Sequence, residues 1–221
     1  MRGGIELLGT NTVGYDSNGN ALVASCTAGF EGYLRSNASK LETITARHCF
    51  QVGEQVDDAQ GVPVGTVSAF RSFDSSGDME VIYMNAAWLK DNWVWLSASS
   101  ERSPITSWNT TYNADQVGQG RSISGITTGY HSGAVTNTNV TVNYGADGNL
   151  PATTVRGMVQ TNICDLPGDS GSPMFAGATA WGINSGGAFT ASGGCTSPAQ
   201  EFYTSLYFLG PNFQSEIQSS S

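Results

Sequence analysis

Short runs in which apolar and polar residues alternate recur along this chain, and they show the period of half-buried β-strands. Five such runs stand out: 42–47, 62–69, 81–84, 140–144 and 153–160. Clusters of Gly, Asn, Asp and Ser lie between them and are typical of turns: 16–20, 74–77 and 145–149. Long helical periodicity is nearly absent. We therefore predict an all-β protein of short strands joined by many turns.

The β pattern weakens near the middle of the chain. Residues 97–115 are rich in Ser, Thr and Asn and include Pro104. We predict a connection here between two β units, one over residues 1–105 and one over 106–221. The run Phe202–Leu209 predicts a strand and then a short helix, which must end before Pro211.

The charge balance excludes several classes of partner. The chain has 221 residues, with 9 Lys and Arg against 18 Asp and Glu, for a net charge of −9. An acidic surface repels phosphate, so we expect no nucleic-acid partner. No apolar run approaches the roughly 20 residues of a membrane-spanning helix, so we also expect no membrane partner.

The four cysteines predict two disulfides and an oxidising compartment, because they are even in number and form no CxxC pair. Three pairings are possible. We favour Cys26–Cys49 and Cys164–Cys195, which keep each bridge within one half of the chain. The first residues contain no apolar signal-peptide core. Together these features lead us to expect a secreted, extracellular protein whose leader has been removed, with Met1 added for expression.

The strongest chemical signal is the segment CDLPGDSGSP at 164–173. Ser170 lies close to two glycines in a predicted tight turn, where the backbone can bend sharply and a substrate can approach. Ser170 is our candidate nucleophile, and the N–H groups of Gly168 and Ser170 are candidate donors to an oxyanion. A structural Gly/Ser turn is the alternative.

A serine nucleophile needs a base and a carboxylate that orients the base. His48 in TARHC is the candidate base; the other histidine, His131, lies in a turn-like GYHSG segment and is interpreted as structural. Asp78 stands at the entrance of a predicted strand and is the candidate carboxylate. Asp74, in a turn, is the second choice, whereas Asp57 and Asp58 are predicted to be solvated.

The segments TARHC, GDMEVIYM, CDLPGDSGSP and NSGG occur in the order His, Asp, Ser. In this order and spacing the chain resembles the chymotrypsin-like serine proteases, and above all their secreted bacterial branch, the streptogrisins and alpha-lytic protease. The resemblance extends to TTGYHSGAV at 127–135 and NVTVNY at 139–144, and so covers most of the chain.

The resemblance implies two packed six-stranded antiparallel β-barrels with the active site between them. It supports His48, Asp78 and Ser170 as the catalytic triad, and it supports both disulfides. It implies that Ser185, Gly186 and Gly187 form a strand that pairs with the substrate backbone. It also implies a zymogen with a pro-segment that assists folding.

Two positions depart from the family pattern. Ser172 replaces the second glycine of Gly-Gly-Pro after the nucleophile, which we expect to be tolerated. In the bacterial branch the aspartate before the nucleophile pairs with an arginine, but Ile123 stands at the matching position here. Our hypothesis is that Arg121 takes this role towards Asp169, because an unpaired buried carboxylate would be costly.

The resemblance implies a specificity pocket based on Asn162 and Ile163, with walls at 184–188 and near 200–202. Asn162 stands where a trypsin-like pocket would have an aspartate, and Asn184 stands near a histidine of the glutamate-specific relatives. We therefore expect cleavage after large apolar residues. The polar Asn184, if it faces the pocket, would instead favour Gln.

We expect a monomeric serine endopeptidase that acts on protein or peptide substrates and that protein inhibitors can bind. Two distant histidines and no Cys/His cluster predict neither a metal site nor a cofactor. The alternatives are a catalytically silent binding protein on a protease fold, or an esterase. An esterase would favour a GxSxG motif on an α/β sheet, and the required alternating helices are missing.

Overall fold

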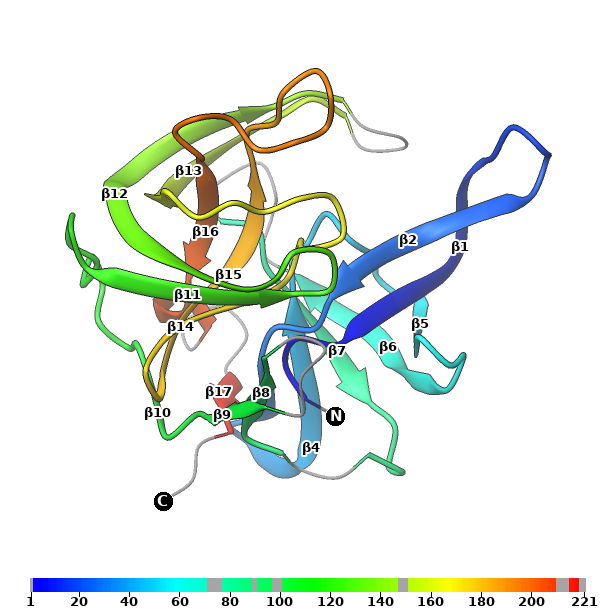
Figure 1. Cartoon of the computed structure of the whole chain (residues 1–221). Coiled ribbons are helices and arrows are strands. Elements are labelled where there is room, and N and C mark those ends of the chain that lie inside the picture. The colour runs from blue at the N-terminus through cyan, green and yellow to red at the C-terminus, as the bar shows by residue number, and fades with distance from the viewer. Residues whose placement is uncertain are drawn as a thin grey trace.

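The computed structural model describes residues 2–70, 77–88, 91–96, 101–146, 151–209 and 215–218. Within these residues the protein is built from strands and one 3₁₀ turn, as Figure 1 shows. The all-β prediction is confirmed, and each of the five alternating runs overlaps a strand. The loops at 74–77 and 145–149 lie largely outside the described residues.

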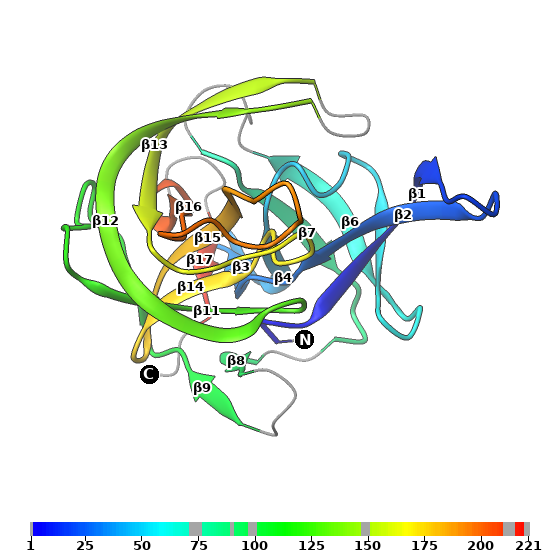
Figure 2. The ribbon, with the colours of Figure 1, turned by 45° about the horizontal axis from the view of Figure 1, so that its top comes forward.

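The N-terminal half forms an eight-stranded sheet in the order β17-β3-β4-β7-β6-β5-β1-β2. Its strands are β1 (Glu6–Tyr15), β2 (Ala21–Thr27), β3 (Glu31–Leu34), β4 (Asn37–Thr45), β5 (Gln55–Asp58), β6 (Pro63–Phe70), β7 (Glu80–Met84) and β17 (Ser215–Ile217). The predicted turn at 16–20 joins β1 to β2, and this hairpin projects from the body of the molecule (Figures 1 and 2). β4 pairs with β7 in a register that sets Thr45 opposite Glu80. The ends of these two strands, where His48 and Asp78 follow and precede them, therefore lie side by side.

The C-terminal half forms a seven-stranded sheet in which six strands close into a ring. The strands are β10 (Ser107–Trp108), β11 (Gly120–Gly125), β12 (Gly129–Tyr144), β13 (Thr153–Thr161), β14 (Pro173–Ala176), β15 (Thr179–Gly187) and β16 (Glu201–Ser205). The ring runs β11-β12-β13-β16-β15-β14 and returns to β11, with β10 attached to β15. Figure 2 shows β12 and β13 curving around β15 and β16. This ring has the six strands that were expected.

Two short strands, β8 (Trp93–Trp95) and β9 (Arg102–Pro104), pair with each other between the two sheets along the chain. After β16 the chain forms a 3₁₀ turn at Leu206–Phe208, where a short helix was predicted. Residues 210–214 lie outside the described part. β17 then pairs with β3 of the N-terminal sheet. The C-terminus therefore crosses back, and that sheet has eight strands where six were predicted. The division after residue 105 stays a prediction.

Two clusters of buried apolar side chains pack against these sheets. The larger cluster fills the N-terminal sheet and includes Phe175, Ile183 and Leu206 from the other half, so the two units share buried contacts. The smaller cluster lies inside the ring and contains Ile123, Met174 and Tyr203, among others. None of the helices found among the described residues has the length and apolar character to cross a membrane.

Candidate active site

His48 and Asp78 form a close pair at the ends of β4 and β7. The His48 backbone N–H donates to Asp78 Oδ1 at 3.0 Å, and His48 Nδ1 lies 2.6 Å from Asp78 Oδ2. Asp78 is fully buried, whereas 19% of the His48 side chain is exposed. With Nδ1–H donating to the carboxylate, the imidazole carries its other nitrogen, Nε2, in the form that accepts a proton.

Asp78 makes further hydrogen bonds with residues of the C-terminal sheet. Ser185 on β15 donates its hydroxyl to Asp78 Oδ2 at 2.5 Å and accepts a hydrogen bond from Tyr144 at 2.9 Å. The Asp78 backbone N–H donates to Thr204 Oγ1 on β16 at 2.7 Å. Both units therefore supply hydrogen bonds to this buried residue, which offset the cost of burying its polar groups. The sequence pointed to neither Thr204 nor Tyr144 here.

Ser170 lies in a turn that only glycine allows at two positions. Gly168 has φ +101° and Gly171 has φ +87°. A Cβ added at Gly171 would collide with the Thr45 hydroxyl and the Thr27 carbonyl, so the turn packs directly against the N-terminal sheet. The neighbouring Ser172 is buried and donates its hydroxyl to the Asp169 carbonyl at 2.5 Å. Because this bond satisfies the buried Ser172 hydroxyl, a serine fits at the position where the family pattern has its second glycine.

The backbone N–H groups of this turn fall into two sets. Those of Asp169, Gly171 and Ser172 donate to carbonyls at 2.9, 2.8 and 3.0 Å. Within the part of the chain that the structure describes, the N–H groups of Gly168 and Ser170 have no acceptor. Gly168 also lines an open hollow of about 460 Å³ together with residues such as Ser25 and Thr127.

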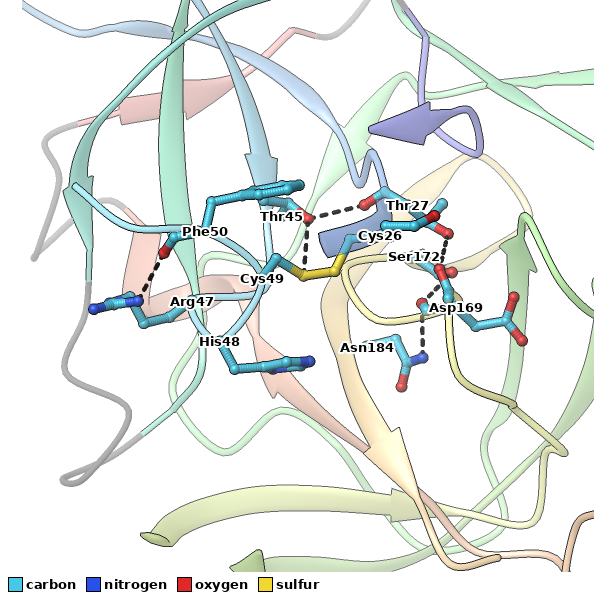
Figure 3. The surroundings of a disulfide bond; sticks show 12 residues. Cys26, Thr27, Thr45, Arg47, His48, Cys49, Phe50, Asp169, Ser172 and Asn184 are labelled. Carbon is cyan, nitrogen blue, oxygen red and sulfur yellow. Dashed lines mark hydrogen bonds between the residues drawn. A yellow bond between two sulfur atoms is a disulfide. The ribbon is translucent and has the colours of Figure 1, made fainter. Parts of the chain in front are cut away.

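A hydrogen bond and a disulfide bring the Ser170 turn to the His48 side of the molecule. Thr27 donates its backbone N–H to the Ser170 carbonyl at 2.8 Å, and Cys26 precedes it. Cys26 is bridged to Cys49, and a His48 ring nitrogen lies within 4.8 Å of both sulfur atoms. Figure 3 shows His48 beside this bridge, with Asp169 and Asn184 across from it. Both sulfurs are oxidised, so they offer no thiolate to a metal.

Two disulfides form, Cys26–Cys49 and Cys164–Cys195, which is the favoured pairing. The first joins β2 to the His48 segment. The second closes the Ser170 segment onto the loop between β15 and β16. Each bridge therefore restrains a loop that carries a candidate site residue.

The hypothesis that Arg121 pairs with Asp169 is wrong. Asp169 accepts hydrogen bonds from the N–H groups of Thr127, Thr128 and Leu166 at 2.8, 3.2 and 3.0 Å, and from the Thr128 hydroxyl at 2.7 Å. Four donors satisfy this buried carboxylate without a cation.

Arg121 instead forms a separate buried cluster with Asp115 and Tyr203. Its Nη2 lies 2.6 Å from Asp115 Oδ1, and its Nε donates to the Tyr203 hydroxyl at 3.1 Å. The guanidinium also stacks 3.8 Å over the Trp181 ring. The register of β11 directs Arg121 to these partners and away from the TTG turn.

The residues assigned to the specificity pocket have other contacts. Asn162 is exposed, and its side-chain oxygen accepts the Ala134 N–H at 2.8 Å. Ile163 belongs to the apolar cluster inside the ring. Asn184 is buried, donates to the carbonyl of Asp169 at 3.0 Å and accepts the Gly186 N–H at 3.1 Å. Its amide is therefore used by the chain itself and does not face a substrate as a free polar group.

The remaining titratable candidates take structural positions. Asp58 was expected to be solvated but is buried, and its Oδ1 accepts the N–H groups of Gln60 and Val62 at 2.9 Å each. His131 is exposed and contacts the Thr128 carbonyl at 2.8 Å, which agrees with a structural role. Asp74 lies outside the described residues.

Two buried acids lie close to the triad: Asp165, which the sequence analysis did not name, and Glu201, which it covered only within the pocket wall near 200–202. Asp165 is 2% exposed, and burial raises its pKa from 3.8 to about 7. Glu201 is fully buried, and burial followed by repulsion from Asp165 raises the pKa of its carboxyl well above 4.5. The signals in the sequence were an acid immediately after Cys164 and an acid within the wall near 200–202.

Comparisons with known proteins agree with this geometry. A family model described as Trypsin matches residues 38–209. Serine protease 2 of Streptomyces fradiae is 39% identical over 185 residues, which make up 81% of this chain and 96% of that protein. Streptogrisin-A of Streptomyces griseus is 38% identical over 178 residues, which make up 80% of this chain and 52% of that protein.

A solved structure is similar over the whole chain. It is described as a glutamic acid specific serine protease that uses a novel histidine triad in substrate binding. The two chains share 27% identity with a TM-score of 0.76, and the match covers 99% of this chain and all of the other. The two-barrel prediction is thereby confirmed.

Proposed function

This chain belongs to the trypsin family of serine proteases, and on that premise we propose that Ser170, His48 and Asp78 are its catalytic triad. The chain is a serine endopeptidase of the chymotrypsin-like kind that acts on protein or peptide substrates. The observation that carries the assignment is the 2.6 Å contact between His48 Nδ1 and the buried carboxylate of Asp78. This contact orients the ring and stabilises the imidazolium that forms during the reaction.

The proposed reaction proceeds through an acyl-enzyme. Ser170 Oγ attacks the carbonyl carbon of the scissile peptide while His48 takes its proton. His48 then gives this proton to the leaving amine, the C–N bond breaks, and the acyl group remains on Ser170. Water repeats the sequence: His48 accepts its proton, the hydroxide adds to the ester, and Ser170 leaves with the proton returned.

The N–H groups of Gly168 and Ser170 are the proposed oxyanion donors. Their lack of acceptors among the described residues, beside three neighbours that are all bonded, supports this role. Donors fixed in a turn cost no reorganisation when the negative charge develops on the substrate oxygen, and one such donor contributes about 3 to 4 kcal/mol to the transition state.

Ser185, Gly186 and Gly187 are the proposed docking strand for the substrate backbone. β14 pairs with β15 only as far as Ile183, and Gly186 and Gly187 pair with β16 on the other side. The side of this strand that β14 leaves is therefore available for β-augmentation by a peptide.

The preference for large apolar residues stays a prediction. It rested on Asn162 and Ile163 as the pocket base, and their contacts with Ala134 and with the ring interior do not support that role. The glutamate preference of the solved relative, which its description links to three histidines, is not supported here either, because this chain has 2 histidines. The acids near Gly187 lead to a different proposal below.

We also propose that the enzyme is secreted, that it is made as a zymogen, and that it acts as a monomer. The two disulfides support an oxidising compartment, since such bonds are rare in the cytosol. Protein inhibitors are proposed to bind along the same docking strand as substrates.

Labelling with an uncharged fluorophosphonate tests the triad. Intact mass should show one adduct on the wild-type chain and none on Ser170→Ala. The matched control is Ser172→Ala, two residues away, which should still label. A folded, disulfide-bonded chain that takes no label would refute the proposed triad and favour the catalytically silent binding protein.

A further inference from the structure

Two buried carboxyl groups next to the triad take no part in the proposed chemistry. They are Asp165, in the segment before Ser170, and Glu201, the first residue of β16. They lie on either side of Gly187, which is part of the proposed docking strand for substrate.

The strand register places both carboxyl groups on one face of the ring. Glu201 lies directly opposite Gly187 on β15 and opposite Thr161 on β13. Directly paired residues of antiparallel strands direct their side chains to the same face. A Cβ added to Gly187 would collide with Asp165 Oδ1, so the Asp165 carboxylate occupies the place that a side chain at 187 would fill.

The face that carries Asp165 and Glu201 also lies next to the proposed triad. Gly187 is two residues after Ser185, whose hydroxyl donates to Asp78 at 2.5 Å. The charges on Asp165 and His48 lie close enough to interact. A side chain that projects from a peptide docked beside Gly187 would therefore enter this face while its carbonyl lies at the Ser170 turn.

The two carboxyl groups are poorly satisfied by the chain. Glu201 Oε2 accepts the Thr161 hydroxyl at 2.6 Å, but Glu201 Oε1 is buried and has no hydrogen-bond partner among the described residues. Asp165 Oδ2 accepts the Asn184 amide over a long distance, 3.3 Å. The buried structural acid nearby, Asp169, has four donors.

A buried acceptor without a donor is costly, and so is a pair of acids without a cation. In the described part of the chain, no ion pair involves Asp165 or Glu201. A guanidinium supplies five N–H donors and a positive charge, and an ammonium supplies three donors and the same charge. Either group would meet the acceptors that the chain leaves open.

We propose that Asp165 and Glu201 are the specificity-determining residues of this endopeptidase, and that they select an arginine or lysine side chain before the scissile bond. This inference rests on the proposed endopeptidase function. A glutamate there would be repelled by whichever of the two acids is ionised, and a phenylalanine or leucine would leave their oxygens unpaired in an apolar contact.

The test uses the full chain and a panel of peptide amides that differ only in the residue before the cleaved bond: Arg, Lys, Gln, Phe, Leu and Glu. The wild-type enzyme should cleave the Arg and Lys peptides with the highest kcat/KM. Glu201→Gln should lower kcat/KM for the Arg peptide about 10- to 100-fold, the loss expected for one charge-assisted hydrogen bond. Asp165→Asn should act in the same direction.

Two controls separate this inference from the proposed function. Glu42→Gln makes the same exchange at a fully buried glutamate of the N-terminal sheet, and should leave the substrate order unchanged. Fluorophosphonate labelling of Ser170 should be unchanged in Glu201→Gln, which shows that this variant is folded and its nucleophile is intact.

The outcomes are distinct. Fastest cleavage after Phe, Leu or Glu by a chain that labels at Ser170 would overturn the assignment of Asp165 and Glu201 and leave the triad standing. A wild-type order that Glu201→Gln and Asp165→Asn both leave unchanged would also overturn it. A wild-type chain that neither labels nor cleaves any peptide would refute the proposed function itself.

Discussion

Replacing Asp165 by asparagine should make the protein more stable at pH 8 and have little effect at pH 4. Burial raises the pKa of Asp165 from 3.8 to about 7 in the folded state, since the carboxyl is 2% exposed and faces Glu201 and Asp169. Asparagine has nearly the same shape and hydrogen-bonding groups as the neutral acid, but it has no charge to desolvate.

The sign of the effect follows from proton linkage. Below about pH 4 both the folded and the unfolded chain hold the proton, and the contribution of Asp165 to stability is complete. Between about pH 4 and 7 the unfolded chain releases its proton while the folded chain keeps it, so the free energy of unfolding falls as pH rises. The gap between 3.8 and about 7 corresponds to a loss of about 4 kcal/mol by pH 8.

Calorimetric melting of Asp165→Asn and the parent chain, both carrying Ser170→Ala to prevent autolysis, measures this difference. A change of 4 kcal/mol in a chain of this size moves Tm by about 10 °C. The variant should therefore melt about 10 °C higher than the parent at pH 8 and at nearly the same temperature at pH 4. Asp57→Asn on β5, where the side chain is half-buried, is the surface control and should show no such pH dependence.

A second readout gives the proton affinity itself. The carboxyl carbon resonance that disappears in Asp165→Asn should titrate near pH 7. A midpoint near 4, or a variant whose Tm difference from the parent is the same at pH 4 and pH 8, would refute the reasoning that burial keeps this carboxyl protonated.

Three further predictions concern the triad and the fold. Ser185→Ala removes one of the donors to the buried Asp78 carboxylate and should lower kcat/KM about 10-fold or more; an unchanged kcat/KM would show that the bond is not used. Arg121→Ala leaves Asp115 buried without its cation and should cost about 3 to 5 kcal/mol of stability in denaturant unfolding, while Ser170 of the folded fraction still labels. The 221-residue chain, unfolded in denaturant with its disulfides intact, should regain little activity on dilution, because the proposed zymogen would need its pro-segment to fold; rapid and full recovery would contradict this.

The features predicted correctly are those that depend on local sequence. Alternation of apolar and polar residues is a local pattern, and the runs at 81–84 and 153–160 became β7 and β13. The tight turn at Ser170 also follows from local chemistry, because Gly168 and Gly171 have positive φ values that other residues avoid.

The wrong hypothesis about Arg121 has a physical reason. Which partner a buried charge reaches depends on strand register and on residues distant in sequence. Tyr203, which contacts Arg121, comes from β16, and the Asp169 carboxylate is satisfied by backbone N–H groups that no residue pattern reveals. The contact of Asn162 could not be predicted for a similar reason, since its partner Ala134 lies on β12.

The sequence by itself determined the all-β class, the order of the candidate triad, and a cysteine set suited to two bridges, because each is encoded in residue type and spacing. Only the tertiary structure decided what surrounds the triad. The register between β15 and β16 brings Glu201 opposite Gly187, and the fold of the Ser170 segment places Asp165 beside them. Burial then raises the pKa of both carboxyl groups above that of an ordinary acid in this acidic chain. The causes, desolvation and repulsion between acids, arise only when distant segments pack together.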